Sequence, residues 1–212
     1  MSGHPEFDRL VEVMARLRLD CPWDAQQTHR SLVRYLVEEA CEVVDAIEIG
    51  ADSHLKEELG DLLLQVVFHA AIAAEDDRFD IEDVARGIAN KLIERHPWVF
   101  ADDPLPDDLN ATWETAKKDA KQRDSALDGI PESLSALSRA AKVVSRVRSH
   151  GVRNSLASDP VTADEIGTAA LDLVARAQAC GIDPEQAVRD VLRTLEAEVR
   201  AAEQASGVRR DG

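Results

Sequence analysis

The sequence has few cysteines and little positive charge. Only 3 of its 212 residues are cysteine, and none belongs to a Cys-x-x-Cys pair, so the sequence indicates neither a disulfide framework nor a zinc site. Lysine and arginine number 25 against 41 aspartates and glutamates, which gives a net charge of −16. Because binding to a nucleic-acid backbone normally needs a basic patch, we expect no nucleic-acid polymer as a partner.

Long apolar runs are also missing. No stretch approaches the roughly 20 apolar residues that a membrane span needs, and the first eight residues lack the apolar stretch of a signal peptide. We therefore expect a cytoplasmic protein without a membrane partner. The 44% of hydrophobic residues, with charges interspersed among them, exclude a disordered chain, and the length suits one domain or two small lobes.

The alternation of apolar and polar residues that marks β-strands is absent as well. Apolar residues recur instead at the spacing of amphipathic helices, which predicts an all-α fold. Ser53 is a candidate N-cap, Pro97 ends a helical stretch, and the Pro- and Asp-rich residues 101–108 form a candidate linker. The predicted helices cover residues 7–20, 28–49, 54–74, 80–96, 109–122, 131–149, 161–179 and 184–204.

A weak internal repeat relates two of these helices. Residues 57–70 match residues 164–177, and the match pairs Glu58 with Glu165. Two helices rich in alanine and leucine can share such a pattern by chance, so the repeat alone leaves both duplication and coincidence open.

Acidic residues concentrate in one segment. Nine acids and a single base lie between residues 38 and 61. If the two helices of this segment form an antiparallel hairpin that turns near residue 50, side chains whose numbers average 50 lie side by side. Glu39 then faces Asp61 and Glu42 faces Glu58, and residues three apart share a helix face. The register therefore predicts a helical bundle in which four carboxylates converge.

Four converging carboxylates need a counter-charge, because an unpaired buried carboxylate is costly or takes up a proton. Asp61 opens a leucine-rich run near the core, and the hairpin has too few basic residues to neutralise the group. Ligands that are all oxygen favour Mg²⁺ or Mn²⁺, and four carboxylates suit more than one ion. The alternative is a solvated acidic hairpin without a metal site. A di-iron bundle is excluded, since neither His54 nor His69 stands three residues after a glutamate.

Four segments carry a resemblance to a known family. They read Cys-Pro-Trp-Asp-Ala-Gln-Gln-Thr-His-Arg-Ser-Leu at 21–32, Tyr-Leu-Val-Glu-Glu-Ala-Cys-Glu at 35–42, Glu-Glu-Leu-Gly-Asp-Leu-Leu-Leu-Gln-Val-Val-Phe-His-Ala at 57–70 and Lys-Leu-Ile-Glu-Arg-His-Pro-Trp-Val-Phe at 91–100. In this order they resemble the MazG family of all-α nucleoside triphosphate pyrophosphohydrolases. The resemblance implies Mg²⁺-dependent cleavage of a standard, modified or deoxy nucleoside triphosphate to the nucleoside monophosphate and pyrophosphate. It also implies as metal ligands the same four carboxylates, Glu39, Glu42, Glu58 and Asp61.

The resemblance further implies a set of nucleotide contacts. Lys91 and Arg95 are four residues apart, so they share a helix face and can hold phosphate oxygens. Trp113 and Lys117 are also four residues apart, and the tryptophan ring can stack on a base. Taken alone, Lys91 and Arg95 can equally be a solvated helix face, and the tryptophan can equally be a packing anchor beside a surface lysine. His54 stands where some family members have a lysine that contacts phosphate. The implied contacts are Glu57, Lys91, Arg95, Trp113 and Lys117.

For the reaction we expect a water molecule to attack the α-phosphorus. Glu38 and Glu57, the clustered acids outside the four ligands, are the candidates for orienting that water molecule. The alternative is a catalytically inactive helical interaction or regulatory module of the same fold, which predicts no turnover and metal binding no tighter than that of a surface acid patch.

Some members of the family have two such lobes, which suggests how the C-terminal half is organised. Thr168 stands where a second lobe would have the metal-binding aspartate, and no Glu-Glu-x-x-Glu precedes it. We predict a catalytic domain over residues 1–122, a smaller degenerate helical lobe over 123–205 and a disordered tail over 206–212. Apolar helix faces without a partner predict a homodimer or a higher homo-oligomer.

Overall fold

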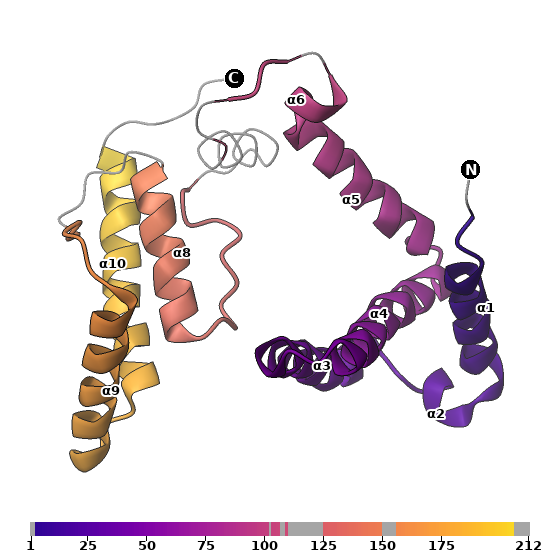
Figure 1. Cartoon of the computed structure of the whole chain (residues 1–212), viewed down its shortest axis with the longest axis horizontal. Coiled ribbons are helices and arrows are strands. Elements are labelled where there is room, and N and C mark those ends of the chain that lie inside the picture. The colour runs from indigo at the N-terminus through magenta and orange to yellow at the C-terminus, as the bar shows by residue number, and fades with distance from the viewer. Residues whose placement is uncertain (1–2, 102, 107–108, 110–124, 150–155, 206–212) are drawn as a thin grey trace. The chain divides into compact units, whose positions relative to one another are not determined.

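All regular secondary structure in the computed structural model is helical within the residues that it describes, which are 3–101, 103–106, 109, 125–149 and 156–205. The prediction of an all-α fold is therefore confirmed (Figure 1). Among the described residues, no helix is both long and apolar enough to cross a membrane. The helices are α1 (Pro5–Asp20), α2 (Pro22–Ala25), α3 (His29–Ile49), α4 (Asp52–Glu75), α5 (Ile81–Arg95), α6 (Pro97–Phe100), α8 (Ala136–Ser149), α9 (Ala163–Ala179) and α10 (Pro184–Ala205).

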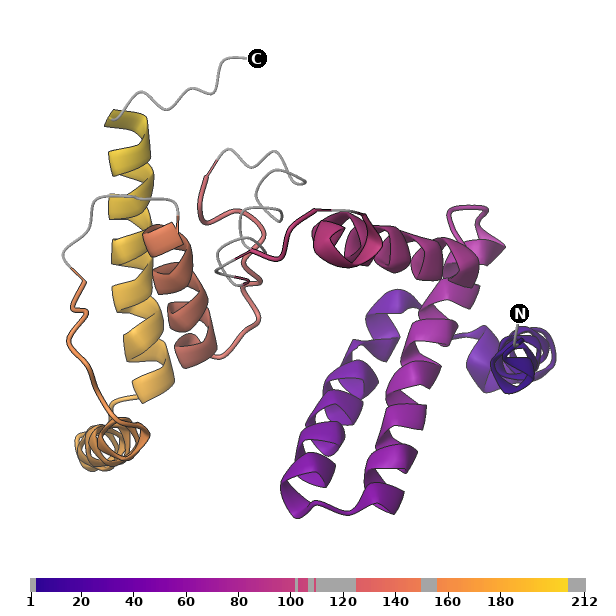
Figure 2. The same cartoon turned by 45° about the horizontal axis from the view of Figure 1, so that its top comes forward.

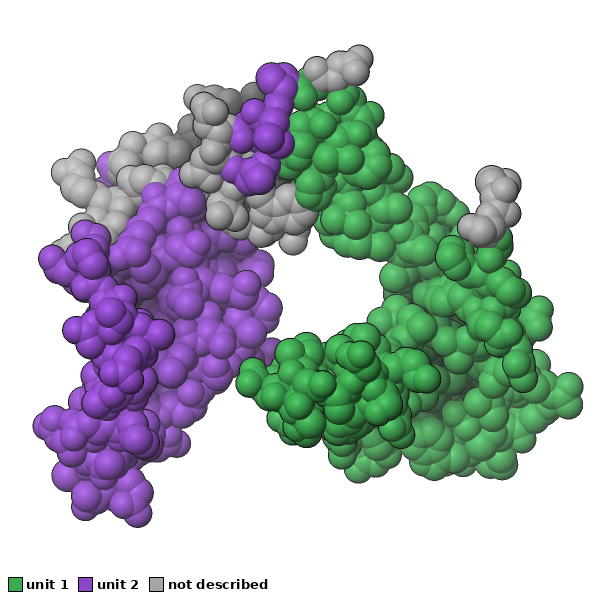
Figure 3. Space-filling model, viewed as in Figure 1, with its two compact units in different colours: residues 1–103 green, residues 104–212 purple. Residues whose placement is uncertain are grey.

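The chain forms two compact units, residues 1–103 and residues 104–212 (Figure 3). The predicted domain boundary at residue 122 lies outside the described residues and stays a prediction. The same holds for the predicted tail over 206–212 and for nearly all of the helix predicted over 109–122.

The first unit is built around an antiparallel hairpin of α3 and α4, which lie side by side along most of their length (Figure 2). Thr28 caps the start of α3, accepting a hydrogen bond from the Ser31 amide at 3.1 Å. Gly50 ends the helix at φ 74°, a left-handed conformation that costs other residues free energy.

The second helix of the hairpin begins earlier than expected. Ser53 was the predicted N-cap, but α4 already begins at Asp52, and Ala51 takes the N-cap position without a side-chain cap. The cause is the short connection, because the left-handed Gly50 reverses the chain and leaves one extended residue before the next helix. This tight turn fixes which residues of α3 and α4 face each other.

Arg18 of α1 anchors the far end of the hairpin. Its guanidinium donates to both carboxylate oxygens of Glu75, the last residue of α4, at 2.6 and 2.5 Å, and to the carbonyl of Gln27 at 3.1 Å. This contact lowers the pKa of Glu75 below its ordinary value. The neighbouring apolar core joins α1, α3 and α4. Its buried residues are Met14, Leu32, Val67, Phe68 and Ile72.

The second unit has its core between α8 and α10, which lie side by side (Figure 2). A buried ion pair crosses this core, where Arg139 donates to the Glu196 carboxylate at 2.9 Å. The helix predicted from residue 131 begins only at Ala136, because the hydroxyl of Ser135 accepts from the Ser138 amide at 3.3 Å and so caps the helix there.

Helix α9 carries the sequence that repeats part of α4, yet it is used differently. None of its residues is buried, whereas α4 buries seven. Glu165, which matches Glu58 in the repeat, accepts from the backbone and the hydroxyl of Thr162 at 2.8 and 2.7 Å. In this lobe the repeated glutamate therefore closes a capping box at the start of its own helix.

Candidate metal centre

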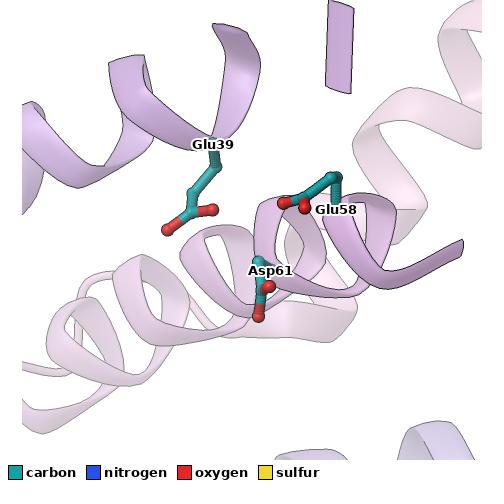
Figure 4. A group of neighbouring side chains, drawn as sticks. All are labelled: Glu39, Glu58 and Asp61. Atoms are coloured by element: carbon teal, nitrogen blue, oxygen red, sulfur yellow. The ribbon is translucent and has the colours of Figure 1, made fainter. Parts of the chain in front are cut away.

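Three carboxylates of the hairpin converge on one point (Figure 4). Glu39 comes from α3, and Glu58 and Asp61 come from α4, where they are one turn apart. One ligand oxygen of each lies within 4.8 Å of the others. The antiparallel packing of two helices thus supplies three acidic ligands from two directions.

The group is partly withdrawn from water. Glu58 is buried with 8% of its surface exposed, and Glu39 and Asp61 are half-buried. Burial raises the pKa of Glu39, and the negative charges of Asp61 and Glu42 raise it further. Without a cation, Glu39 therefore holds a proton at a higher pH than an ordinary glutamate does.

Glu42 is the exception among the four predicted ligands. It hydrogen-bonds with Glu39 and adds to the charge on it, but it is exposed and does not belong to the group of three. Glu39 meets both acids of α4, whereas the place of Glu42 opposite Glu58 as a fourth ligand stays a prediction. A three-residue step turns a side chain by about 60° around a helix axis, and this rotation takes Glu42 toward solvent.

The only basic partner of the group in the described part of the chain is a histidine. His54, one turn before Glu58 on α4, contacts the Glu58 carboxylate, with 2.9 Å between Nε2 and Oε1. Neither lysine nor arginine pairs with Glu39, Glu58 or Asp61 among the described residues.

The remaining predicted site residues lie at different distances from the cluster. Glu38 and Glu57 are exposed neighbours of Glu39 and Glu58, and Glu38 is close enough to raise the pKa of Glu39. Trp113 and Lys117 lie outside the described residues.

The two predicted phosphate ligands of α5 are not brought beside the carboxylates. Lys91 is exposed and Arg95 is buried with 8% of its surface exposed. Helix α5 extends from the C-terminal end of α4, whereas Glu58 and Asp61 lie in the N-terminal half of α4 (Figure 2). Their contact with phosphate stays a prediction.

The donor set fits a hard divalent cation. Three carboxylates with one histidine partner leave an excess of negative charge, which a cation such as Mg²⁺ or Mn²⁺ would neutralise. Glu39, Glu58 and Asp61 are the residues that would hold it. Its charge would offset both the burial and the repulsion that raise the pKa of Glu39.

Comparison with known proteins matches the segment that carries this site. Residues 27–100 match the family described as the MazG nucleotide pyrophosphohydrolase domain. An uncharacterized 26.1 kDa protein of Streptomyces cacaoi is 45% identical over 92% of this chain and 81% of its own length. The Thermotoga maritima nucleoside triphosphate pyrophosphohydrolase/pyrophosphatase MazG is 38% identical over 88% of this chain and 81% of its own length. The Escherichia coli nucleoside triphosphate pyrophosphohydrolase is 45% identical, but the matched region spans only 59% of that protein.

We predict that Mn²⁺ binding depends on the three converging carboxylates and on pH. Calorimetric titration should show Asp61→Asn and Glu39→Gln weakening Mn²⁺ binding by about tenfold or more, because each removes one charged ligand. Lowering the pH from 7 to 5 should weaken binding to the wild type, since the raised pKa of Glu39 lets protons compete with the metal.

Glu48→Gln is the matched control, because it removes the same charge from an exposed position on the same helix. Equal loss of affinity in Glu48→Gln and Glu39→Gln would show that Mn²⁺ binding depends only on the net charge of the hairpin.

Proposed function

The chain belongs to the MazG family of nucleotide pyrophosphohydrolases, and we propose that it hydrolyses nucleoside triphosphates to nucleoside monophosphates and pyrophosphate. The observation that carries this proposal is the group of Glu39, Glu58 and Asp61 inside the matched segment. A hydrolase that acts on the acid anhydride of a polyanion needs a positive counter-charge, and three convergent carboxylates are suited to hold one.

The proposed cofactor is Mg²⁺, with Mn²⁺ as a substitute. Glu39, Glu58 and Asp61 would hold it, and exposed Glu42 beside Glu39 would add negative charge at the edge. When bound, the cation would lie between carboxylates and phosphates and stabilise the charge that develops as pyrophosphate leaves. This accounts for how an acidic hairpin accepts a substrate with about four negative charges.

The proposed reaction is a displacement by water. A water oxygen forms a bond to the α-phosphorus, the bond from this phosphorus to the bridging oxygen breaks, and pyrophosphate leaves. Glu38 and Glu57 are exposed beside the cluster, so either carboxylate can orient the water and accept its proton. Lys91, Arg95, Trp113 and Lys117 remain the proposed contacts for phosphate and base.

The proposal places the enzyme in a reducing compartment. All three cysteines, Cys21, Cys41 and Cys180, are unpaired. Free thiols persist where glutathione and thioredoxin keep them reduced, which supports the cytoplasm as the place where the enzyme meets its nucleotides.

To test the reaction, we predict pyrophosphate release from nucleoside triphosphates with Mg²⁺ and none after chelation. Asp61→Asn and Glu58→Gln should lower kcat/KM by about a hundredfold or more, because each removes charge that holds the cation. Glu48→Gln should keep the wild-type rate.

The products distinguish this reaction from loss of the γ-phosphate. Release of orthophosphate and a nucleoside diphosphate, or unchanged turnover in Asp61→Asn, would overturn the assignment. A panel of standard, deoxy and chemically modified triphosphates then identifies the preferred base, including the specificity expected of a house-cleaning enzyme.

We also propose that the chain forms a homodimer through the outer face of α3. Val33, Val37, Val44 and Ile47 recur at helical spacing on this face, and each has more than half of its surface exposed. Neighbouring residues of the same helix, Leu36 and Ala40 among them, line an apolar groove. A contiguous exposed apolar stripe of this kind marks an interaction surface.

Sedimentation velocity tests the dimer. Val37→Glu and Val44→Glu should shift the wild-type dimer to monomer, since a charge in the interface lacks a partner. Leu19→Glu is the control, because Leu19 is an exposed apolar residue on α1. A wild type that sediments as a monomer, or a dimer that survives both valine variants, would contradict this interface.

A further inference from the structure

Two histidines and an arginine form a hydrogen-bonded chain at the end of the hairpin that lies away from the carboxylates. His29, the first residue of α3, and His69 of α4 stack with parallel rings, and their Nδ1 atoms are 2.8 Å apart. Arg78, which follows α4, contacts Nε2 of His29 at 2.7 Å. Neither the proposed metal centre nor the proposed reaction uses these residues.

The direction of each hydrogen bond in this chain follows from the arginine. A guanidinium has only donors, so Arg78 donates and Nε2 of His29 must accept. His29 therefore carries its proton on Nδ1 and donates it to Nδ1 of His69. Since His69 accepts at Nδ1, it carries its own proton on Nε2.

The surroundings of His69 favour its neutral form. Burial lowers the pKa of His69, and the neighbouring His29 lowers it further. His29 is the first residue of α3, and its Nε2 accepts from Arg78. Asp76 balances Arg78 through an ion pair at 3.5 Å.

The series of hydrogen bonds from Arg78 to His69 ends on a buried donor that has no acceptor among the described residues. Nε2 of His69 is fully buried and lacks a hydrogen-bond partner. One turn earlier on the same face of α4, Oε1 of Gln65 is also buried and lacks a donor, and only 5% of Gln65 is exposed. A neutral donor and a neutral acceptor thus stand four residues apart, and each is costly to leave unsatisfied.

We propose that Gln65 and His69 together bind one buried water molecule. The water accepts from Nε2–H of His69 and donates to Oε1 of Gln65. A bare cation would meet the N–H dipole unfavourably and an anion would meet the amide oxygen, so the pair selects a molecule that both accepts and donates. Because both atoms are shielded from solvent, the pair selects a ligand as small as water over a nucleotide.

This water extends the hydrogen-bond chain from Arg78 through His29 and His69 to Gln65. Gln65 is one turn from Asp61 along α4. A continuous set of hydrogen bonds thereby links the start of α3 to the middle of α4. Loss of these hydrogen bonds should increase local opening of the hairpin.

The histidine tautomers give the first test, on the full wild-type chain labelled with ¹⁵N. Long-range ¹H–¹⁵N correlation should assign the proton of His29 to Nδ1 and that of His69 to Nε2. The Nε2 proton of His69 should exchange slowly and show a rotating-frame Overhauser contact to a long-lived water. A proton on Nδ1 of His69, or an Nε2 proton without a water contact, would overturn the proposal.

A pair of substitutions gives an independent sign test. If the water bridges the two groups, Gln65→Met and His69→Phe should each raise the opening equilibrium constant, measured by hydrogen exchange of buried α4 amides, by about fivefold or more. The double variant should raise the opening equilibrium constant by less than the product of the two single-variant factors. If no water is bound, Gln65→Met removes an unsatisfied acceptor and should lower the opening constant.

Gln178→Met is the matched control, because Gln178 is exposed on α9 of the other unit. It should leave the exchange of α4 amides unchanged. Should Gln65→Met fail to fold, the tautomer and water measurements on the wild type decide the question alone.

Discussion

Repulsion among three carboxylates is the constraint on which the rest of the first unit depends. Glu39, Glu58 and Asp61 lie within 4.8 Å of one another, and Glu58 is buried. Such a group opens the hairpin unless a proton or a cation reduces its charge or the packing elsewhere holds the helices together. Burial, together with the charges of Asp61 and Glu42, raises the pKa of Glu39 and so favours the first of these responses. The proposed divalent cation is the second, and it makes the repulsion useful for binding a polyphosphate.

The packing that resists this repulsion lies toward the other end of the hairpin. There the apolar core joins α1 to α3 and α4, and Arg18 ties α1 to the end of α4 through Glu75. His29 and His69 add a polar contact between α3 and α4 in the same region. The hairpin is therefore polarised, with cohesive contacts at one end and an acidic cluster at the other. Proteins commonly offset the cost of a functional site in this way.

Much of this arrangement follows from the sequence because helical periodicity and hairpin register are local properties. Glu39, Glu58 and Asp61 could be placed together from spacing alone, whereas the exposure of Glu42 could not be foreseen, since rotation around α3 depends on how the helices pack. The prediction of Ser53 as the N-cap was wrong for a related reason, because the left-handed Gly50 sets the start of α4 at Asp52. These differences arise from tertiary geometry that propensities do not contain.

The sequence also contains a register signal that pairs two histidines of the hairpin. His29 and His69 have numbers that average 49, within one residue of the register that paired the acids, so the same reasoning could have paired them. Their hydrogen-bond directions needed Arg78, which follows α4 by sequence but is placed by the fold. The orphaned atoms of Gln65 and His69 are likewise visible only once burial is known.

Anomalous X-ray scattering from crystals grown with Mn²⁺ can show whether the three carboxylates hold a divalent cation. We expect a manganese peak bounded by the carboxylates of Glu39, Glu58 and Asp61. Crystals saturated with Mn²⁺ whose anomalous density is absent from this point, or is found only among other surface acids, would contradict it.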